Sequence, residues 1–243
     1  MNNSIDIDIS HISKRFGNIV ALDDVSMQFN AGTLYGVIGP AGAGKTTLFR
    51  LMLHLMKQNS GTITYTSGGA PIDFEDARAL IAYMPQSQSL YADLSVEEHL
   101  DFFRRLYGIP DNEYRRKKSK LLRMARLEKF LDRPAGNLSG GMYKKLGLIC
   151  ALLRSPRVML LDEPTNGVDP ISRREFWDLL HAAQQQGILV IMTTAYMDEA
   201  ERCGAVVLME RGHVLGMGEP RELLRTSHSA NFDEYFLKRG GAK

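Results

Sequence analysis

Residues Gly39 to Thr47 read "GPAGAGKTT" and fit the pattern G-x-x-x-x-G-K-[ST]. Glycines in such a turn let backbone N–H groups point inward around phosphate oxygens, because they carry no Cβ atom that would clash. The apolar run "TLYGVIG" precedes the turn, and apolar residues at helical spacing follow it in "KTTLFRLMLHLM". A strand before and a helix after are the context in which this pattern forms a phosphate loop, with the helix dipole directed at the anion. The stretch therefore predicts an α/β unit with a phosphate site.

The loop suggests a role for each of its polar side chains. Lys45 is expected to reach the β- and γ-phosphates of a nucleotide, and the Thr46 hydroxyl is expected to bind Mg²⁺. A glycine turn with a chance lysine is the alternative, and the flanking strand and helix disfavour it. The residues that we expect to line the phosphates are Gly39, Pro40, Ala41, Gly42, Ala43, Gly44, Lys45, Thr46 and Thr47.

A second apolar run, "VMLLDEP" at residues 158–164, ends in two carboxylates. A buried strand that ends in Asp162 places this carboxylate near the metal, in the same core as the phosphate loop. Glu163 can face the γ-phosphate and polarise the attacking water as a general base. Acids at strand ends also cap following helices, but here Pro164 follows directly. We therefore predict that Asp162 binds Mg²⁺ and that Glu163 is catalytic.

Further strands are indicated by two kinds of pattern. "IDIDI" alternates strictly from Ile5 to Ile9 and predicts a half-buried strand, and "GTITY" predicts another short one. "ILVIMTT" is a continuous apolar run of the kind found in buried parallel sheets. "AVVLME" and "HVLGMG" are separated by Arg211-Gly212, which indicates a hairpin. Together with the phosphate loop, these patterns predict an α/β fold.

The middle of the chain differs in pattern and in charge. From about Ser95 to Arg133 the pattern is helical, and it predicts a helical lobe inserted into the α/β core. Residues 111–133 carry a net charge of +5, against −3 for the rest of the chain. The basic stretch "RRKKSK" at residues 115–120 is interpreted first as a solvated helix face and second as a contact to anionic lipid headgroups.

Composition excludes several classes of protein. A net charge of +2 over 243 residues gives no reason to expect nucleic-acid binding. Cys150 and Cys203 are too few for a secreted disulfide scaffold, so a reducing cytosol is expected. No window reaches ~18 apolar residues, so no membrane-spanning helix is expected. "MNNSIDIDISHISKRF" has no unbroken apolar core, so it is not expected to be a signal peptide, and "RGGAK" is expected to be a tail or the start of a linker.

The stretch "NLSGGMYKKLGLICALLRSPRVMLLDEP" at residues 137–164 resembles the signature segment of ATP-binding cassette (ABC) ATPases. The resemblance covers nearly the whole chain. It implies a P-loop NTPase core of the RecA-like type, with an N-terminal antiparallel β subdomain and an inserted α-helical subdomain. Residues 1–243 are then one nucleotide-binding domain. Residues 1–86 and 157–243 form the β subdomain and core, and residues 87–156 form the helical lobe with the signature.

The same resemblance implies further site residues. Phe16 matches the aromatic residue that stacks on adenine, and Gln86 matches the glutamine loop, which implies that it is a catalytic residue and a Mg²⁺ ligand. Lys45 and Glu163 complete the implied catalytic set. Asp169 in "GVDP" matches the D-loop. Ser139, Gly140 and Gly141 open a helix and so form an anion site, and in the family this site contacts ATP held by a second cassette facing head to tail.

"YMPQ", "DEAE" and "GVDPISRRE" resemble ATPase subunits of bacterial ABC-2 type exporters. The resemblance implies ATP and Mg²⁺ as ligands, a transmembrane permease as partner, and a cytoplasmic location at the inner face of the cell membrane. The region of Leu90 and Tyr91 then meets the permease, with local packing of the lobe as the alternative. The cargo is not determined, because it would meet the membrane subunit.

Two residues depart from the family pattern. Met142 is the fifth residue of the signature, a position where glutamine is the commonest residue in the family. We expect this change to have a small effect. Ala195 falls where the family has a switch histidine that contacts the γ-phosphate, and the six histidines all lie outside this loop. Because this donor is lost, we predict that the site hydrolyses ATP at a rate on the order of 10²–10³-fold below that of a site with the histidine.

The loss at Ala195 favours an asymmetric pair, in which this chain lends its signature to a competent partner cassette. A homodimer stays possible. Two other functions stay open, a soluble ABC ATPase acting on ribosomes or DNA, and a regulatory cassette that binds ATP without turnover.

Overall fold

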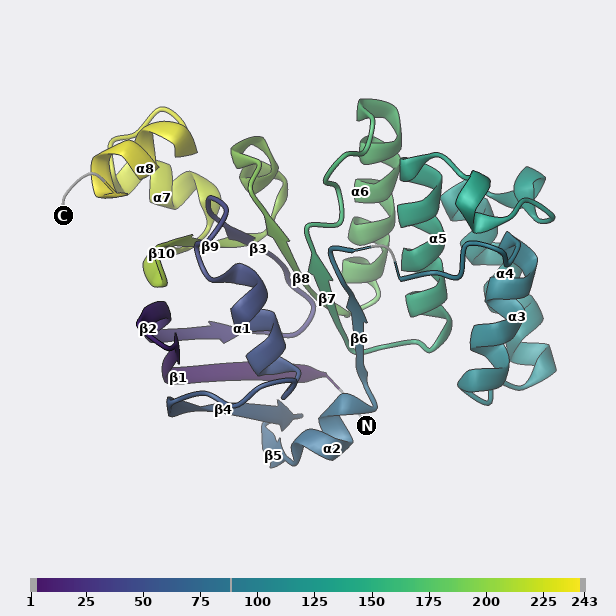
Figure 1. Cartoon of the computed structure of the whole chain (residues 1–243), viewed down its shortest axis with the longest axis horizontal. Helices are drawn as coiled ribbons and strands as arrows, with labels where there is room; N and C mark the ends of the chain where they lie inside the picture. The colour runs from purple at the N-terminus through teal and green to yellow at the C-terminus, as the bar shows by residue number, and fades with distance from the viewer. Residues whose placement is uncertain (1–3, 88, 241–243) are drawn as a thin grey trace.

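A six-stranded sheet forms the centre of the computed structural model, which describes residues 4–87 and 89–240. Its strands lie in the order β10-β9-β3-β8-β7-β6 (Figure 1). All neighbours are parallel except β10, which pairs antiparallel with β9. The bounds are β3 Leu34–Ile38, β6 Ile81–Met84, β7 Val158–Asp162, β8 Leu189–Thr194, β9 Ala205–Glu210 and β10 His213–Gly218.

The continuous apolar runs of these strands are explained by burial on both faces. Successive side chains of a strand point to opposite sides of the sheet. Leu160 of β7 and Ile191 of β8 therefore pack on one face, whereas Met159 and Met192 pack on the other. The prediction of buried parallel strands is confirmed, and so is the α/β class.

A second, antiparallel sheet has the order β2-β1-β4-β5. Its bounds are β1 Ile5–Phe16, β2 Ile19–Phe29, β4 Ser60–Ser67 and β5 Ala70–Ile72. Ile5, Ile7 and Ile9 are buried while Asp8 is exposed, which confirms the half-buried strand predicted from the alternation. Helix α1 (Lys45–Met52) shares an apolar core with this sheet and with one face of the central sheet, and the short helix α2 (Phe74–Arg78) follows β5.

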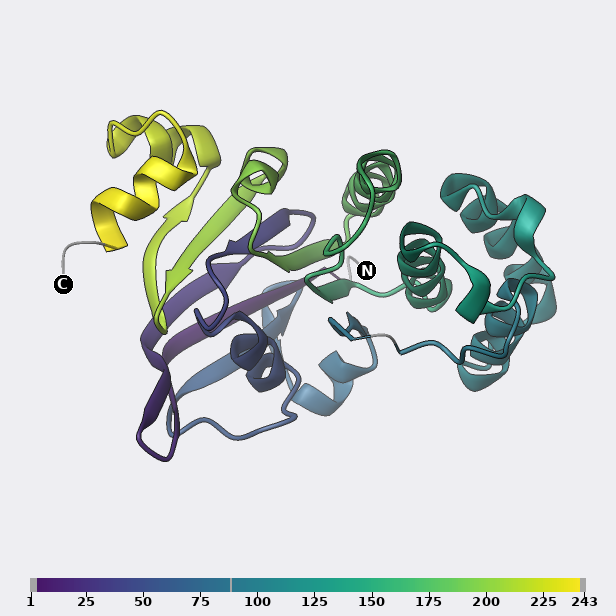
Figure 2. The same cartoon turned by 45° about the horizontal axis from the view of Figure 1, so that its top comes forward.

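The helical elements α3 (Val96–Leu106), α4 (Asp111–Ala125) and α5 (Gly140–Leu153) lie away from the antiparallel sheet (Figure 2). Helix α3 begins at a capping box, in which Ser95 accepts the N–H of Glu98 and the Glu98 side chain accepts that of Ser95. The helical pattern continues to residue 133, but helix α4 ends at Ala125. Arg126 adopts a left-handed conformation, and the 3₁₀ helices η1 (Glu128–Phe130) and η2 (Ala135–Asn137) follow.

All three long helices of this lobe fall between residues 87 and 156, and the strands of both sheets fall outside that range. Within "RRKKSK", Arg115, Arg116 and Lys120 are exposed, as the solvated-face interpretation predicts. Lys117 and Lys118 are half-buried and pair with Glu113 and Glu97.

The last third of the chain contains α6 (Pro170–Gln185), α7 (Pro220–Thr226) and α8 (Phe232–Gly240). The segment after β8 contains the 3₁₀ helix η3 (Met197–Arg202). Arg211 and Gly212 both have positive φ, 48° and 82°, and confirm the predicted hairpin between β9 and β10. Of the expected tail, residues 241–243 lie outside the described part of the chain.

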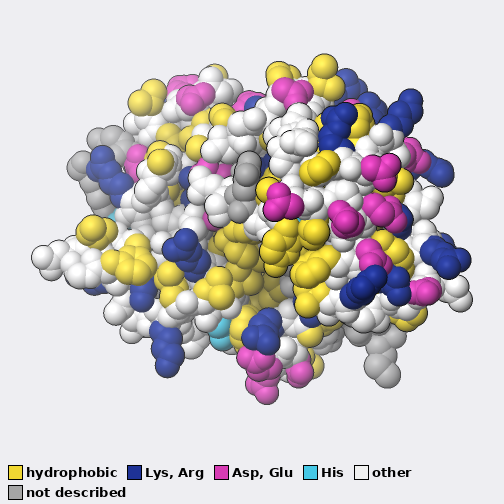
Figure 3. Space-filling model, turned by 45° about the vertical axis from the view of Figure 1, so that its right-hand side comes forward, with side chains coloured by type: hydrophobic (Ala, Val, Ile, Leu, Met, Phe, Trp, Pro, Cys, Tyr) yellow, Lys and Arg dark blue, Asp and Glu magenta, His cyan; other side chains and the backbone are white. Residues whose placement is uncertain are grey.

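Two surface properties bear on function. Within the described residues, no helix is long and apolar enough to cross a bilayer. Figure 3, which brings the helical side forward, shows hydrophobic side chains gathered in a hollow near the middle of the face, with charges of both signs around them.

Candidate active site

The predicted phosphate loop connects β3 to α1 and borders a cavity of about 280 Å³. Two glycines allow its close approach to the neighbouring strands. A Cβ atom on Gly39 would lie 2.0 Å from the carbonyl oxygen of Met209, and one on Gly44, at φ 103°, would lie 2.5 Å from that of Ala21. The cavity is lined by Ile19, Val20, Ala21, Ala41, Gly42, Ala43, Gly44, Lys45, Thr46, Thr47, Gln86 and Glu163. The tertiary fold thus brings Gln86 and Glu163 to the loop, as the sequence analysis expects.

Lys45 points back into the loop. Its Nζ donates to the carbonyl oxygens of Gly39 at 2.7 Å and Pro40 at 3.1 Å, and lies 3.5 Å from Glu163 Oε1. Burial lowers the pKa of this ammonium, and the nearby Glu163 and Asp162 carboxylates oppose that shift. The buried cation is therefore held only by carbonyls and a carboxylate, and phosphate oxygens are stronger partners that it can exchange for them.

Asp162 at the end of β7 is almost wholly buried beneath the loop. Its Oδ1 accepts from Thr193 Oγ1 at 2.6 Å and from Thr46 Oγ1 at 3.2 Å, whereas its buried Oδ2 has no partner. An unpaired buried carboxylate oxygen beside a threonine hydroxyl fits Mg²⁺, a hard cation that takes oxygen ligands. The described residues contain no cluster of three His, Cys, Asp or Glu side chains able to hold a metal. A bound Mg²⁺ would therefore take its other ligands from phosphates and water.

Glu163 has a positive φ of 45°, an uncommon value for a side chain of this size. Its backbone N–H donates to Thr193 Oγ1 at 2.9 Å. Its Oε2 accepts from Gln86 Nε2 at 2.9 Å and from Asn166 Nδ2 at 3.4 Å. The strained backbone and these donors aim the carboxylate into the cavity, where a general base would be needed.

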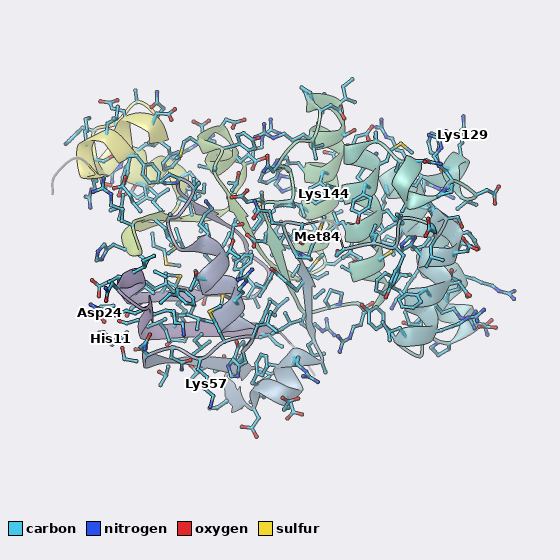
Figure 4. All side chains as sticks on the ribbon, in the orientation of Figure 1. His11, Asp24, Lys57, Met84, Lys129 and Lys144 are labelled. Carbon is cyan, nitrogen blue, oxygen red and sulfur yellow. The ribbon has the colours of Figure 1, made fainter. Side chains whose placement is uncertain are left out.

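Lys144, Thr193 and Asn166 are site residues that no sequence pattern indicated. Lys144 of α5, labelled in Figure 4 beside Met84, donates to the carbonyl oxygen of Gln86 at 3.0 Å. Burial lowers the pKa of Lys144, and Asp162 and Glu163 oppose the shift. The sequence shows two adjacent lysines, Lys144 and Lys145, after the signature, and two threonines, Thr193 and Thr194, at the end of β8. Neither pattern indicates which residue the side chain contacts in the fold.

Other predicted residues lie outside the described lining of this cavity. Ser139 caps α5, and its Oγ accepts the N–H of Met142 at 3.3 Å. Gly141 packs on the first turn of α6, where Asp169 accepts the N–H groups of Ile171 and Ser172. The signature and the D-loop residue therefore form a second surface, separate from the chain's own phosphate loop.

Phe16 ends β1 and is 47% exposed, with Lys14 Nζ 5.1 Å from its ring centre. It pairs in register with Ile19, which lines the cavity, although Phe16 itself is not among the lining residues. Of the two residues expected to meet a permease, Tyr91 is 57% exposed, whereas Leu90 is half-buried and donates its N–H to the Tyr143 hydroxyl.

Ala195 follows β8 and borders a small cavity of about 120 Å³ together with Glu163, Asn166, Thr194 and Tyr196. The methyl group offers no hydrogen bond to the carboxylate across this cavity. Three histidines elsewhere are surface or packing residues, as expected. His11 pairs with Asp24 at 2.8 Å on the surface (Figure 4), His54 stacks on Phe74, and His99 is fully buried.

Comparisons with known proteins agree with this geometry. The model of the family described as ABC transporter matches residues 22–166. The probable multidrug ABC transporter ATP-binding protein YbhF of Escherichia coli (strain K12) is 42% identical over 235 residues, which are 96% of this chain and 40% of the relative. The Nod factor export ATP-binding protein I of Sinorhizobium fredii is 36% identical over 219 residues, 90% of this chain and 64% of the relative.

A solved structure of an ATP-binding subunit of an ABC transporter has a TM-score of 0.83 at 28% identity, over 96% of this chain and 99% of that one. The chain therefore matches nearly the full length of this solved ATP-binding subunit. It spans only about two-fifths of YbhF and under two-thirds of the Nod factor protein.

Proposed function

This chain belongs to the ABC transporter family of ATP-binding proteins, and on that premise we propose that it binds and hydrolyses Mg-ATP to power export through a separate membrane-spanning subunit. One observation carries the proposal. Lys45, Thr46 and Glu163 line a single cavity, and Asp162 lies directly beneath it with an unpaired buried oxygen. The names of the relatives support export, since one is a probable multidrug transporter protein and the other exports Nod factor.

Each residue of the chain has a task in this chemistry. The Lys45 ammonium leaves the loop carbonyls for the β- and γ-phosphate oxygens. Thr46, Asp162 and Gln86 would hold Mg²⁺, which when bound neutralises charge on the transferred phosphoryl group. Glu163 accepts the proton of the attacking water, whose oxygen bonds to the γ-phosphorus while the bridging oxygen leaves with ADP.

The second anion site supports pairing with another cassette. Ser139, Gly140 and Gly141 present the N-terminus of α5 to phosphate, yet they do not line the described cavity of their own loop. We propose that they complete the site of a second cassette, on another chain or in a longer protein. The location that follows is cytoplasmic, at the inner face of the membrane and against a permease. No nucleic-acid partner is proposed.

The pair is proposed to be asymmetric. The signature from Leu138 to Gly141 is complete, whereas Ala195 offers its own site no switch donor. This chain's site would then hold ATP or turn it over slowly, while the partner site hydrolyses quickly. Ser139→Arg in the native assembly should remove most hydrolysis, and Lys45→Ala should remove less. If Lys45→Ala proves the more damaging, the site on this chain is the faster one and the asymmetric assignment is wrong.

A regulatory cassette without turnover is the second candidate, favoured by the absence of a hydrogen-bond donor on the Ala195 side chain. Two measurements on the full-length protein decide between them, titration with Mg-ATP and phosphate release by wild type and Glu163→Gln. We expect tight binding in both forms and loss of phosphate release in Glu163→Gln. Glu201→Gln, at an exposed position on η3, is the matched control. Failure to bind Mg-ATP would overturn the proposal, and binding without any phosphate release would favour the regulatory function.

A further inference from the structure

Asn166 is the amide that faces the catalytic carboxylate from the side of Ala195. Its Nδ2 donates to Glu163 Oε2 at 3.4 Å, and its Oδ1 accepts from the Tyr196 hydroxyl at 3.3 Å. The carboxylate defines which end of the amide faces Glu163, because an ionised carboxylate only accepts hydrogen bonds and a flipped amide would set its oxygen against it. The Tyr196 hydroxyl, which can donate or accept, holds the other end of the amide in place.

Tyr196 is itself held in place. Its N–H donates to Thr194 Oγ1 at 3.0 Å, and its ring lies beneath the guanidinium of Arg173, 4.7 Å from the ring centre. Arg173 is tied in turn to Asp198 at 3.1 Å and to Glu199 at 2.7 Å. The Tyr196 hydroxyl is therefore presented to Asn166 from an anchored ring.

The segment that carries Asn166 is joined to the same anchor. Glu199 is fully buried, and besides Arg173 it accepts from Thr165 Oγ1 at 3.1 Å and Trp177 Nε1 at 3.4 Å. Thr165 directly precedes Asn166. One buried carboxylate thus connects the turn after β7 with η3 after β8, so that Asn166 and Tyr196 keep their relative position.

The other contacts of Glu163 show why Asn166 would matter for the reaction. In this structure the Glu163 side chain meets Gln86, Asn166 and Lys45. Under the proposed function, Gln86 and Lys45 turn to Mg²⁺ and the phosphates, which leaves Asn166 as the donor to Oε2. Oε1 then stays free to accept a proton from water.

We propose that Asn166, oriented by Tyr196, is the positioning residue that holds Glu163 toward the attacking water in this chain, where residue 195 supplies no side chain for the task. The inference rests on the proposed function. The contact of 3.4 Å is long, as catalytic hydrogen bonds often are before the nucleotide binds. The cavity of about 120 Å³ between Asn166, Glu163 and Ala195 has room for water beside the carboxylate.

The experiment uses the full-length protein. The rate of ATP hydrolysis at this chain's own site is defined as the part of the total rate that Glu163→Gln removes. Asn166→Asp keeps the shape of the side chain but replaces the donor with a second carboxylate. We expect kcat to fall on the order of 10-fold or more, with the KM for ATP little changed. Tyr196→Phe removes only the hydroxyl and should cause a smaller loss. Asn30→Asp is the matched control, because Asn30 is exposed and its side chain bonds to no other described residue.

The pH profile separates positioning from mere structural support. A carboxylate at residue 166 repels the ionised Glu163 carboxylate. The base must be ionised to act, so the acid limb of the kcat profile should move to higher pH in Asn166→Asp and part of the rate should return there. The other charged groups around Glu163, namely Lys45, Asp162 and Lys144, are the same in both proteins.

The double variant with Ala195→His completes the test. An imidazole at residue 195 should take over part of the task, so Asn166→Ala should cost less in that background than in wild type. If Glu163→Gln abolishes turnover but Asn166→Asp keeps the wild-type kcat and pH profile, the inference is wrong and the proposed function stands. If Glu163→Gln changes nothing, the catalytic part of the proposed function fails and this inference fails with it.

Discussion

Thr193 Oγ1 lies 2.6 Å from Asp162 Oδ1, and the same hydroxyl accepts the backbone N–H of Glu163 at 2.9 Å. The two residues are register partners on the adjacent parallel strands β7 and β8. A single hydroxyl on one strand therefore sets the position of both carboxylates at the end of the other. Since Asp162 and Thr193 are almost wholly buried, neither can exchange this bond for water.

Thr193→Val should destabilise the fold, because it removes the shorter of the two hydrogen bonds to Asp162 Oδ1 and takes away the acceptor of the Glu163 N–H. Loss of one partner of a buried polar group costs about 1–3 kcal/mol. Denaturant unfolding measures the change, and Thr193→Ser, which keeps the hydroxyl, should recover most of it. Equal stability of the valine and serine variants would contradict the importance of this bond.

Lys45→Ala should weaken Mg-ATP binding by on the order of 10- to 100-fold, the value of one charge-assisted contact to phosphate. Nucleotide titration measures it. Lys57→Ala is the control, because Lys57 is an exposed lysine beyond the end of α1 (Figure 4). If Lys45→Ala binds Mg-ATP as tightly as wild type, the assignment of the phosphate loop is wrong. We expect the substitution to leave the fold intact.

Ala195→His should raise steady-state phosphate release by up to on the order of 10²-fold, because it restores a donor beside Glu163. Ala195→Leu is the matched control, since it adds bulk to the same cavity without a polar group, and it should not accelerate the reaction. An imidazole variant no faster than wild type would mean that residue 195 does not limit the rate.

The free energy of unfolding should fall as pH drops below about 6.5, because of His99. Burial lowers the pKa of this imidazole from its ordinary value of 6.5, although its hydrogen bonds to backbone carbonyls oppose the shift. The unfolded chain therefore takes up a proton at a pH where the folded chain does not, so stability is complete above the unfolded pKa and declines toward the folded one. Unfolding curves between pH 5 and 8 check this, and His99→Gln should show a shallower slope. An identical slope in both proteins would assign the effect to other groups.

Much of the site could be predicted from the sequence because its parts are contiguous. The phosphate loop needs glycines, a lysine and a threonine within nine residues, and the backbone of one short segment forms the whole cradle. Asp162 and Glu163 were found for the same reason, at the end of a buried strand. The parallel sheet and the hairpin at Arg211-Gly212 also follow from local patterns. A strand buried on both faces has a continuous apolar run, and a tight hairpin turn with positive φ favours glycine.

Helix ends were less predictable. The charged segment after Asp111 continues in a helical pattern past Ala125, yet Arg126 ends α4 in a left-handed turn. Likewise η3 is a 3₁₀ helix, with Glu199 at its centre held by Arg173, Thr165 and Trp177. In both places contacts to other elements outweigh weak local preferences.

The sequence by itself determined the family, the α/β core and the residues that would hold the phosphates and the metal. Only the tertiary structure decided which groups orient them. Thr193 meets Asp162, Asn166 meets Tyr196, and Lys144 meets Gln86 because parallel strands and crossover helices bring together segments about 30 to 60 residues apart. No local pattern encodes such pairs, since sheet order and register depend on packing of the whole core.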